Sequence, residues 1–302
     1  MIRLIALLVG LCAALPVATP VAAQDKPLVR FGAIADPQYA PAAPRGTRYY
    51  ANSLWKLSEA IEKLNGENLD FVVTLGDIID RHVDAYNHIL PIYQKVETDN
   101  WFVLGNHEYD VGKDYVQTVP MFLGMKDRYY SFVDNGVRFI TTDGNDLSMY
   151  ATPAGIPRRK EAEAMFNALV KAEAVNAKTW NGGVSEEQFN WLKGELDAAQ
   201  KAGELVVIFN HFPAAPDNNH NLWNYKDMQA MLGQYDNVMA YFNGHNHAGN
   251  YGVVDGVHYV TVEGMLETAD TTAYAIIEVY NDRIEMKGFG RASDRSLPHP
   301  VQ

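Results

Sequence analysis

Cysteine is almost absent from this chain of 302 residues, which contains only one, Cys12. Cys12 lies within the apolar stretch at residues 4–15, close to the start of the chain. If that stretch is removed on maturation, the remaining chain has no thiol. A disulfide framework, thiolate metal ligands and a cysteine nucleophile are then all excluded.

Positive charge is scarce as well, because 25 lysine and arginine residues face 37 aspartate and glutamate residues, which gives a net charge of −12. Binding to nucleic acid without regard to sequence needs a basic surface, so we expect no nucleic-acid partner. The acidity does not exclude a phosphate substrate, since bound divalent cations would invert the local field. No feature of the sequence indicates an oligomeric state.

Long apolar runs are limited to the beginning of the chain. The stretch at residues 4–15 is too short to span a bilayer, which takes about 20 apolar residues. Arg3 precedes it and the small residues Val21-Ala22-Ala23 follow it, as is typical of a secretory signal. We therefore predict a signal peptide at residues 1–23, a secreted or periplasmic protein, and no membrane anchor after cleavage. An uncleaved anchor is the alternative.

The remaining residues, 24–302, are expected to form one α/β domain. Their composition is typical of a folded globular protein, with 47% hydrophobic and 21% charged residues in the whole chain. In the first half, strand-like apolar runs alternate with stretches of helical spacing, which favours parallel strands joined by helices. The strands are expected at residues 29–34, 70–75 and 101–104, and the helices at residues 49–64 and 85–96.

Hairpins are expected in the second half. Asp134-Asn135-Gly136, Asp255-Gly256 and Asn281-Asp282 are turn signals between strand-like runs. Strands are expected at residues 129–133, 137–142, 205–209, 238–242, 251–254, 257–262, 274–280 and 283–287. Helices are expected over residues 158–177 and from Ser185 onwards. We predict two sheets in one domain, a β-sandwich flanked by helices.

Five short polar clusters follow predicted strands, and each offers oxygen or imidazole metal ligands. They are Asp36-Pro37-Gln38, Gly76-Asp77, Gly105-Asn106-His107-Glu108, Asn210-His211 and Gly244-His245-Asn246-His247. The carboxyl ends of strands in an α/β sheet converge on one edge, so these clusters could meet and hold two metal ions. Each cluster alone is more simply a turn or an ordinary histidine. Five in this order are hard to explain as turns.

Together the clusters resemble the pattern of the calcineurin-like metallophosphoesterase superfamily, in which histidine stands where this chain has Gln38. Further segments are similar to the manganese-dependent ADP-ribose/CDP-alcohol diphosphatases of that superfamily. They are residues 31–39, 48–50, 75–80, Asn181-Gly182-Gly183, residues 262–268 and residues 288–291. The resemblance covers nearly all of residues 24–302 and implies a four-layer αββα fold.

The resemblance implies a role for each matching residue. One divalent ion would be held by Asp36, Gln38, Asp77 and His247, and a second by Asp77, Asn106, His211 and His245, with Asp77 bridging. His107 would bind no metal and would act as the catalytic group on the substrate phosphate. Gln38 supplies a neutral hard oxygen in place of imidazole, which favours Mn²⁺ or Mg²⁺ over Zn²⁺. Mn²⁺ is the expected ion, with Mg²⁺, Fe or Zn²⁺ as alternatives.

The implied function is hydrolysis of the diphosphate in nucleoside diphosphate-linked small molecules such as ADP-ribose or CDP-alcohols. A metal-bridging hydroxide would attack one phosphorus in line, and His107 would contribute about 10²–10⁴-fold. Arg48 and Arg291 are candidate substrate contacts, although a surface arginine or a structural salt bridge explains each more simply. Asp80 and Glu108 either orient ligands or are plain solvated carboxylates.

Two other functions stay open at this stage. One is a phosphomonoesterase or cyclic-nucleotide phosphodiesterase on the same dinuclear site; Gln38 and residues 263–268 argue against it. The other is a non-catalytic binding scaffold. Such proteins typically lose ligands or the motif histidine, whereas this chain keeps Asp77, His107 and the remaining histidines.

Overall fold

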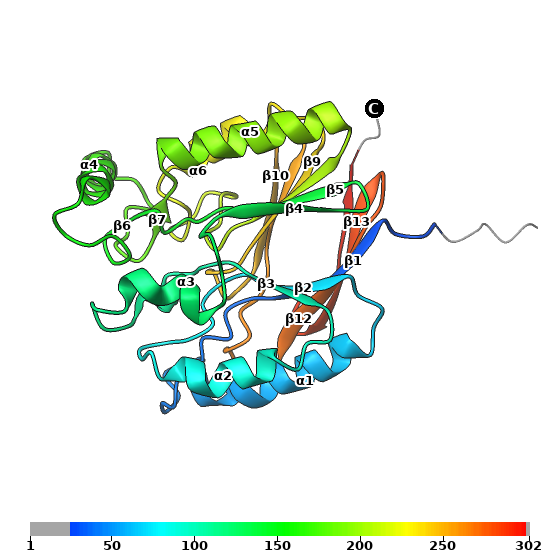
Figure 1. Ribbon diagram of the computed structural model, residues 1–302, viewed down its shortest axis with the longest axis horizontal. Helices are drawn as coiled ribbons and strands as arrows, with labels where there is room; N and C mark the ends of the chain where they lie inside the picture. The colour runs from blue at the N-terminus through cyan, green and yellow to red at the C-terminus, as the bar shows by residue number, and fades with distance from the viewer. Residues whose placement is uncertain (1–24, 300–302) are drawn as a thin grey trace, which may run out of the picture.

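The computed structural model describes residues 25–299. The predicted signal peptide at residues 1–23, including Cys12, lies outside this range. Two six-stranded sheets pack face to face, and helices cover their outer faces (Figure 1). The predicted two-sheet sandwich flanked by helices is therefore confirmed. Among the described helices, none combines the length and the apolar character needed to cross a membrane.

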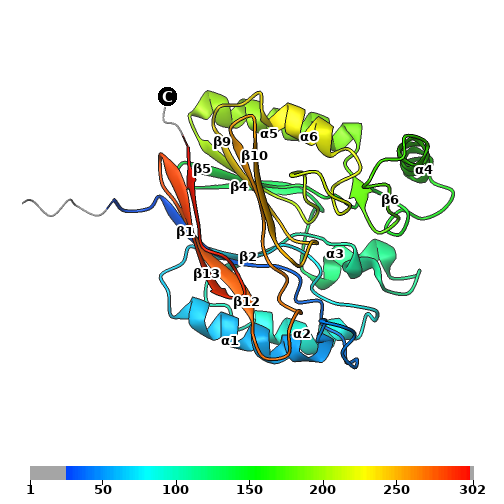
Figure 2. The same ribbon diagram turned by 180° about the vertical axis from the view of Figure 1, so that it is seen from behind.

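The first sheet joins parallel strands from the beginning of the chain to antiparallel strands from its end. Its spatial order is β14 (Arg295–Pro298), β13 (Arg283–Gly290), β12 (Ala273–Val279), β1 (Val29–Ile34), β2 (Phe71–Thr74) and β3 (Asp99–Phe102). Strands β1, β2 and β3 run parallel, as the alternation of strands and helices predicts. Helices α1 (Ser53–Asn65) and α2 (Ala85–Tyr93) connect them and lie on the outer face of this sheet (Figure 2).

The second sheet also mixes parallel and antiparallel strands, in a different arrangement. Its spatial order is β10 (Asn250–Val254), β11 (Val257–Thr261), β9 (Val238–Asn243), β8 (Leu205–Phe209), β5 (Val137–Thr141) and β4 (Tyr130–Asp134). The four inner strands are parallel, and a hairpin closes each edge. Asn135 and Gly136 have φ angles of 43° and 80°, as the predicted two-residue hairpin turn requires. Helices α5 (Glu186–Ala202) and α6 (Tyr225–Leu232) cover the outer face.

A smaller group of elements lies at one end of the sandwich (Figure 1). It contains α3 (Val119–Phe122), the short strands β6 (Leu147–Ser148) and β7 (Gly182–Gly183), and α4 (Pro157–Lys171). Residues 25–299 also contain 3₁₀ turns at Tyr50–Asn52, His107–Tyr109 and Val116–Thr118, the last of which leads directly into α3. Ala162 is the one buried residue of α4, which agrees with the expected solvated helix.

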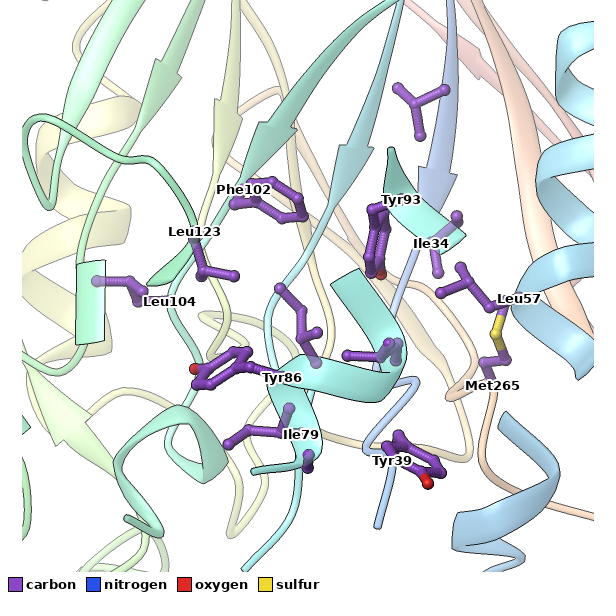
Figure 3. Packing of buried hydrophobic residues seen from close by; sticks show 14 of the residues in the cluster. Ile34, Tyr39, Leu57, Ile79, Tyr86, Tyr93, Phe102, Leu104, Leu123 and Met265 are labelled. Atoms are coloured by element: carbon purple, nitrogen blue, oxygen red, sulfur yellow. The ribbon is translucent and has the colours of Figure 1, made fainter. Parts of the chain in front are cut away.

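Apolar side chains form separate layers on both sides of each sheet. Between the sheets, Phe31 stacks on Phe71 with ring centroids 4.9 Å apart, and Phe139 and Phe209 join them. Figure 3 shows part of the layer between the first sheet and its helices. Each fully buried side chain of this kind stabilises the fold by about 1.5–3 kcal/mol. These layers hold the strand ends in fixed relative positions.

Some predicted boundaries were wrong. The helix expected over residues 49–64 begins only at Ser53, after a 3₁₀ turn. Tyr49 has φ −113° and ψ 68°, outside the helical region, and its backbone N–H donates to the carbonyl oxygen of Leu266 2.9 Å away in a tertiary contact. The helix expected over residues 158–177 ends at Lys171.

Other elements differ by a few residues or were not expected. Strand β3 lies at Asp99–Phe102 rather than at residues 101–104, and α2 ends at Tyr93 rather than at residue 96. The elements β6, β7, β14, α3 and α6 had no counterpart in the prediction. They are short, so they carry little periodic signal.

Candidate active site

The five polar clusters lie at the carboxyl ends of five parallel strands. Three follow β1, β2 and β3 of the first sheet, and two follow β8 and β9 of the second. Ligand atoms of these clusters converge in two groups, within which every atom lies within 4.8 Å of the others. One group contains Asp77, His211 and His245, and the other contains Asp36, Asp77 and His247. Asp77 belongs to both, so the geometry accommodates two neighbouring cations.

His211 is held so that its Nε2 atom faces two acceptors. Its Nδ1 atom lies 2.8 Å from the carbonyl oxygen of Leu75, which can only accept, so Nδ1 carries a hydrogen. Nε2 lies 3.2 Å from Asp77 Oδ2 and 3.2 Å from Asn106 Oδ1. Burial would lower the pKa of His211, but the Asp77 carboxylate outweighs burial and raises it to about 9. These atoms therefore favour a positive charge between them, either a proton or a metal cation.

His247 and His245 are also oriented by neighbouring acceptors. The Nδ1 atom of His247 lies 2.9 Å from Glu267 Oε1, which leaves Nε2 3.7 Å from Asp36 Oδ1. A hydrogen bond from His247 lowers the pKa of Glu267 to about 2. The Nε2 atom of His245 lies 2.9 Å from Asn181 Oδ1, so its Nδ1 atom is the one free to bind a cation. Burial holds the pKa of His245 well below its usual range.

Gln38 and Asp77 provide the test of whether cations fit this site. Gln38 Oε1 and Asp77 Oδ2 are buried, and neither has a hydrogen-bond partner within residues 25–299. Buried oxygens of this kind are costly unless something binds them. The amide of Gln38 is held in this orientation because its Nε2 atom donates to Asp80 Oδ2 at 2.8 Å. Two unpartnered oxygens beside imidazole nitrogens form a suitable donor set for Mn²⁺ or Mg²⁺.

Several of these residues have strained backbone conformations. Asp36, Gln38, Asp77 and His245 have φ angles of 48°, 45°, 54° and 67°. Non-glycine residues rarely adopt positive φ, and when they do they cluster at functional sites. The strain is maintained by dense packing around the loops. A Cβ atom at Gly76 would lie 2.5 Å from the His211 ring, so only glycine fits there.

Glu108 connects two of these loops. Its carboxylate is fully buried and accepts the backbone N–H groups of Asp77, Ile78 and Gly105. Burial raises its pKa to about 7. Of the two possibilities for Glu108, the solvated carboxylate is thus wrong.

His107 lies beside the two ligand groups but belongs to neither, because its ring nitrogen contacts a different carboxylate. Its backbone N–H donates to Asp77 Oδ1 at 2.8 Å, and its Nδ1 atom lies 2.6 Å from Asp110 Oδ2. Burial would lower the pKa of His107, but Asp77 and Asp110 raise it to about 9. The Nε2 atom is left to act as a hydrogen-bond donor.

A cavity of about 320 Å³ opens over these atoms. It is lined by Arg48, Asp77, Asn106, His107, Trp180, His220, His245 and His247. The Trp180 side chain is 44% exposed, which is unusual for so large an apolar group. Arg291 does not line the cavity; its guanidinium donates to the carbonyl oxygen of Gly264 at 3.0 Å.

The family model for calcineurin-like phosphoesterases matches residues 29–249. The chain belongs to the calcineurin-like phosphoesterase family. It is 33% identical over 316 residues to the manganese-dependent ADP-ribose/CDP-alcohol diphosphatase of Homo sapiens, covering 89% of this chain and 92% of that protein. The diphosphatase of the same name from Arabidopsis thaliana is 29% identical over 300 residues, covering 89% and 96%.

A solved structure agrees with these sequence relatives. The dimetal phosphatase of Danio rerio superposes on this calcineurin-like phosphoesterase with a TM-score of 0.82 and 26% identity, covering 91% of this chain and all of that one. The superfamily and the diphosphatase resemblance inferred from the motifs are confirmed.

Some residues of this calcineurin-like phosphoesterase site could not be found from its motifs. Glu267, Asn181 and Asp110 orient histidines. Glu267 and Asn181 lie in the family-like segments 262–268 and Asn181-Gly182-Gly183, but the sequence assigned them no role, and Asp110 lies in no such segment. Trp180 and His220 line the cavity from loops before β7 and before α6. The position of Trp180 directly before the family-like segment Asn181-Gly182-Gly183 was the signal available for this side chain.

Proposed function

We propose that this chain is a metal-dependent hydrolase that cleaves the diphosphate of nucleoside diphosphate-linked small molecules of the ADP-ribose or CDP-alcohol type. The observation that carries the proposal is the pair of ligand groups sharing Asp77, together with the unpartnered oxygens of Gln38 and Asp77. When bound, two divalent ions would supply an activated water and neutralise charge on the phosphoryl group. The proposed products are a nucleoside monophosphate and a phosphorylated partner.

The proposed ligands divide into two sets. The first ion would be held by Asp36, Gln38, Asp77 and His247, and the second by Asp77, Asn106, His211 and His245. We propose Mn²⁺ because the related diphosphatases are named manganese-dependent. The neutral amide oxygen of Gln38 and the absence of cysteine after Cys12 favour the same choice over Zn²⁺.

His107 is proposed as the catalytic group for the leaving phosphate. Asp110 holds its Nδ1 atom, so the proton available to substrate is the one on Nε2. With its pKa raised to about 9, His107 carries that proton at neutral pH. It can therefore donate to an oxygen of the departing phosphate as negative charge accumulates there.

The cavity also suggests how the nucleoside part of the substrate is held. Arg48 is positioned at its edge, where a guanidinium suits a phosphate. Trp180 offers an exposed aromatic face for a base. Stacking depends little on which base is present, so one tryptophan suits both adenine and cytosine nucleotides. Arg291 donates to the carbonyl oxygen of Gly264 and does not line this cavity, and its contact with substrate stays a prediction.

A substrate panel tests the proposal directly. Purified protein with Mn²⁺ is offered ADP-ribose, CDP-glycerol, cyclic AMP and p-nitrophenyl phosphate, and products are separated by chromatography. We expect hydrolysis of the first two with release of AMP or CMP. Activity on the last two alone would refute the diphosphatase assignment, and no metal-dependent hydrolysis at all would favour the non-catalytic scaffold.

We also propose that residues 1–23 are a cleaved signal peptide and that the protein works in the periplasm or outside the cell. Arg3, the apolar residues 4–15 and the small residues 21–23 support this. Amino-terminal sequencing of protein recovered from the periplasm or medium should begin near Gln24. Recovery of the full-length chain from the cytoplasm would contradict it.

A further inference from the structure

An irregular segment, residues 264–268 between β11 and β12, passes close to one half of the proposed metal centre. Met265 and Leu266 of this segment are fully buried. A buried segment outside helices and sheets needs partners for its carbonyl oxygens, because unpartnered ones are costly.

A single buried lysine supplies most of these partners. Lys56 of α1 has no solvent exposure, and its ammonium donates to the carbonyl oxygens of Met265 at 3.0 Å, Glu267 at 2.7 Å and Thr268 at 2.6 Å. An ammonium has three hydrogens, so all its donors are used on this one segment. Burial lowers the pKa of Lys56 to about 8, which leaves it charged at neutral pH. Its neighbour Leu57 lies in the same buried cluster as Met265 (Figure 3).

The segment in turn holds two of the proposed ligands of the first ion. The backbone N–H of Leu266 donates to the carbonyl oxygen of Asp36 at 3.1 Å. The carboxylate of Glu267 lies 2.9 Å from Nδ1 of His247 and sets which ring nitrogen is free. The supports of the second ion are different, since Leu75 orients His211 and Asn181 orients His245.

We propose that Lys56 is a positioning residue for the first metal site, acting through residues 264–268 and the Glu267–His247 pair. This rests on the proposed function only in requiring that the site binds divalent cations. Lys56 touches neither substrate nor the proposed ligands. Asp77 belongs to both sites, so the effect of Lys56 should be greater on the first of the two binding constants for Mn²⁺ rather than absent from the second.

Titration calorimetry of the full chain with Mn²⁺ chloride tests this. Lys56→Met should weaken first-site binding about 10–100-fold, as removal of an outer partner of a metal ligand does elsewhere, and should weaken second-site binding clearly less. His247→Ala identifies which constant belongs to the first site. Lys63→Met, an exposed lysine on the same helix, is the matched control and should change neither constant.

A double-mutant cycle tests whether Lys56 acts on the first metal site through Glu267. If Lys56 acts through Glu267, then Lys56→Met combined with Glu267→Gln should bind the first ion no more weakly than the worse single variant. Should Lys56→Met fail to fold, Lys56→Gln retains two N–H donors and should show a smaller loss at the same site. Either variant refutes the proposal if it lowers the melting temperature while both Mn²⁺ constants stay unchanged, or if both constants fall equally. Additive losses in the cycle would refute the route through Glu267. A wild-type chain that binds no Mn²⁺ would overturn the proposed function as well.

Discussion

Replacing Glu108 by glutamine is expected to destabilise the fold at the point where two ligand loops meet. The Glu108 carboxylate accepts three backbone N–H groups, two on Oε2 from Asp77 and Gly105, and one on Oε1 from Ile78. Glutamine has one oxygen and an NH₂ group that cannot accept. In its best orientation it keeps the two bonds at the Oε2 position and turns its NH₂ group toward the N–H of Ile78.

The cost can be worked from these contacts. One buried N–H left without an acceptor costs about 1–3 kcal/mol, and two bonds lose the assistance of a charge, about 0.5–1 kcal/mol each. We therefore expect the free energy of unfolding to fall by about 2–5 kcal/mol at pH 8. Urea denaturation of metal-free protein, followed by circular dichroism, measures it.

The pH dependence of this difference follows from the pKa of Glu108. Because burial raises that pKa to about 7, the folded protein carries the charged carboxylate at pH 8 and the protonated acid at pH 5. The unfolded chain releases this proton near the ordinary pKa of 4.5, so between pH 4.5 and 7 the folded wild type binds more protons than the unfolded chain and its stability rises as the pH falls. Glutamine does not titrate in this range, so the difference between wild type and Glu108→Gln should grow as the pH falls from 8 to 5. Glu62→Gln, an exposed change on α1, is the control. A loss of less than about 0.5 kcal/mol at pH 8, the range of ordinary surface changes, would refute the reasoning.

Four further outcomes are expected. His107→Ala should keep its Mn²⁺ and lose about 10²–10⁴-fold in kcat, measured beside metal content; loss of the metal would contradict a purely catalytic role. Asp80→Leu should leave the Nε2 atom of Gln38 without its acceptor and weaken Mn²⁺ binding about 10–100-fold, and unchanged binding would contradict that orientation role. In metal-free protein, Glu267 should stabilise the fold relative to Glu267→Gln, because its hydrogen bond with His247 lowers the pKa of Glu267 to about 2. This stabilisation should be full above pH 4.5 and disappear as the pH falls toward 2. A difference in stability that does not change with pH would contradict this. Mn²⁺ at about 100 times its Kd should stabilise the chain by about 2.7 kcal/mol for each ion bound, reversibly with a chelator, and an unchanged unfolding curve would count against a metal site.

Local patterns in the sequence predicted the parts of the fold that depend on them. The parallel strands β1 to β3 and the turns at Asn135-Gly136 and Asp255-Gly256 have strong periodic or turn signals. The start of α1 could not be predicted, because Tyr49 is held by a hydrogen bond to Leu266, more than two hundred positions away in the chain. Propensity has no access to such contacts.

The candidate site likewise has a part that the sequence predicted and a part that it did not. The converging clusters could be found because they follow strands whose carboxyl ends share an edge. Their supports could not, since Lys56, Glu267 and Asn181 become neighbours of the ligands only when α1, the 264–268 segment and β7 are packed together. Arg291 donates to the carbonyl oxygen of Gly264, and its contact with substrate stays a prediction.

The most direct test of the central claim is the metal content and the activity of one purified sample. The sample is loaded with Mn²⁺ and freed of excess metal. Elemental analysis then measures its metal content, and an ADP-ribose assay measures its activity. We predict two Mn²⁺ ions per chain with release of AMP, and loss of both properties in Asp77→Asn, which removes the shared carboxylate. A chain that hydrolyses ADP-ribose without metal, or that holds two ions and leaves ADP-ribose and CDP-glycerol intact, would contradict the account.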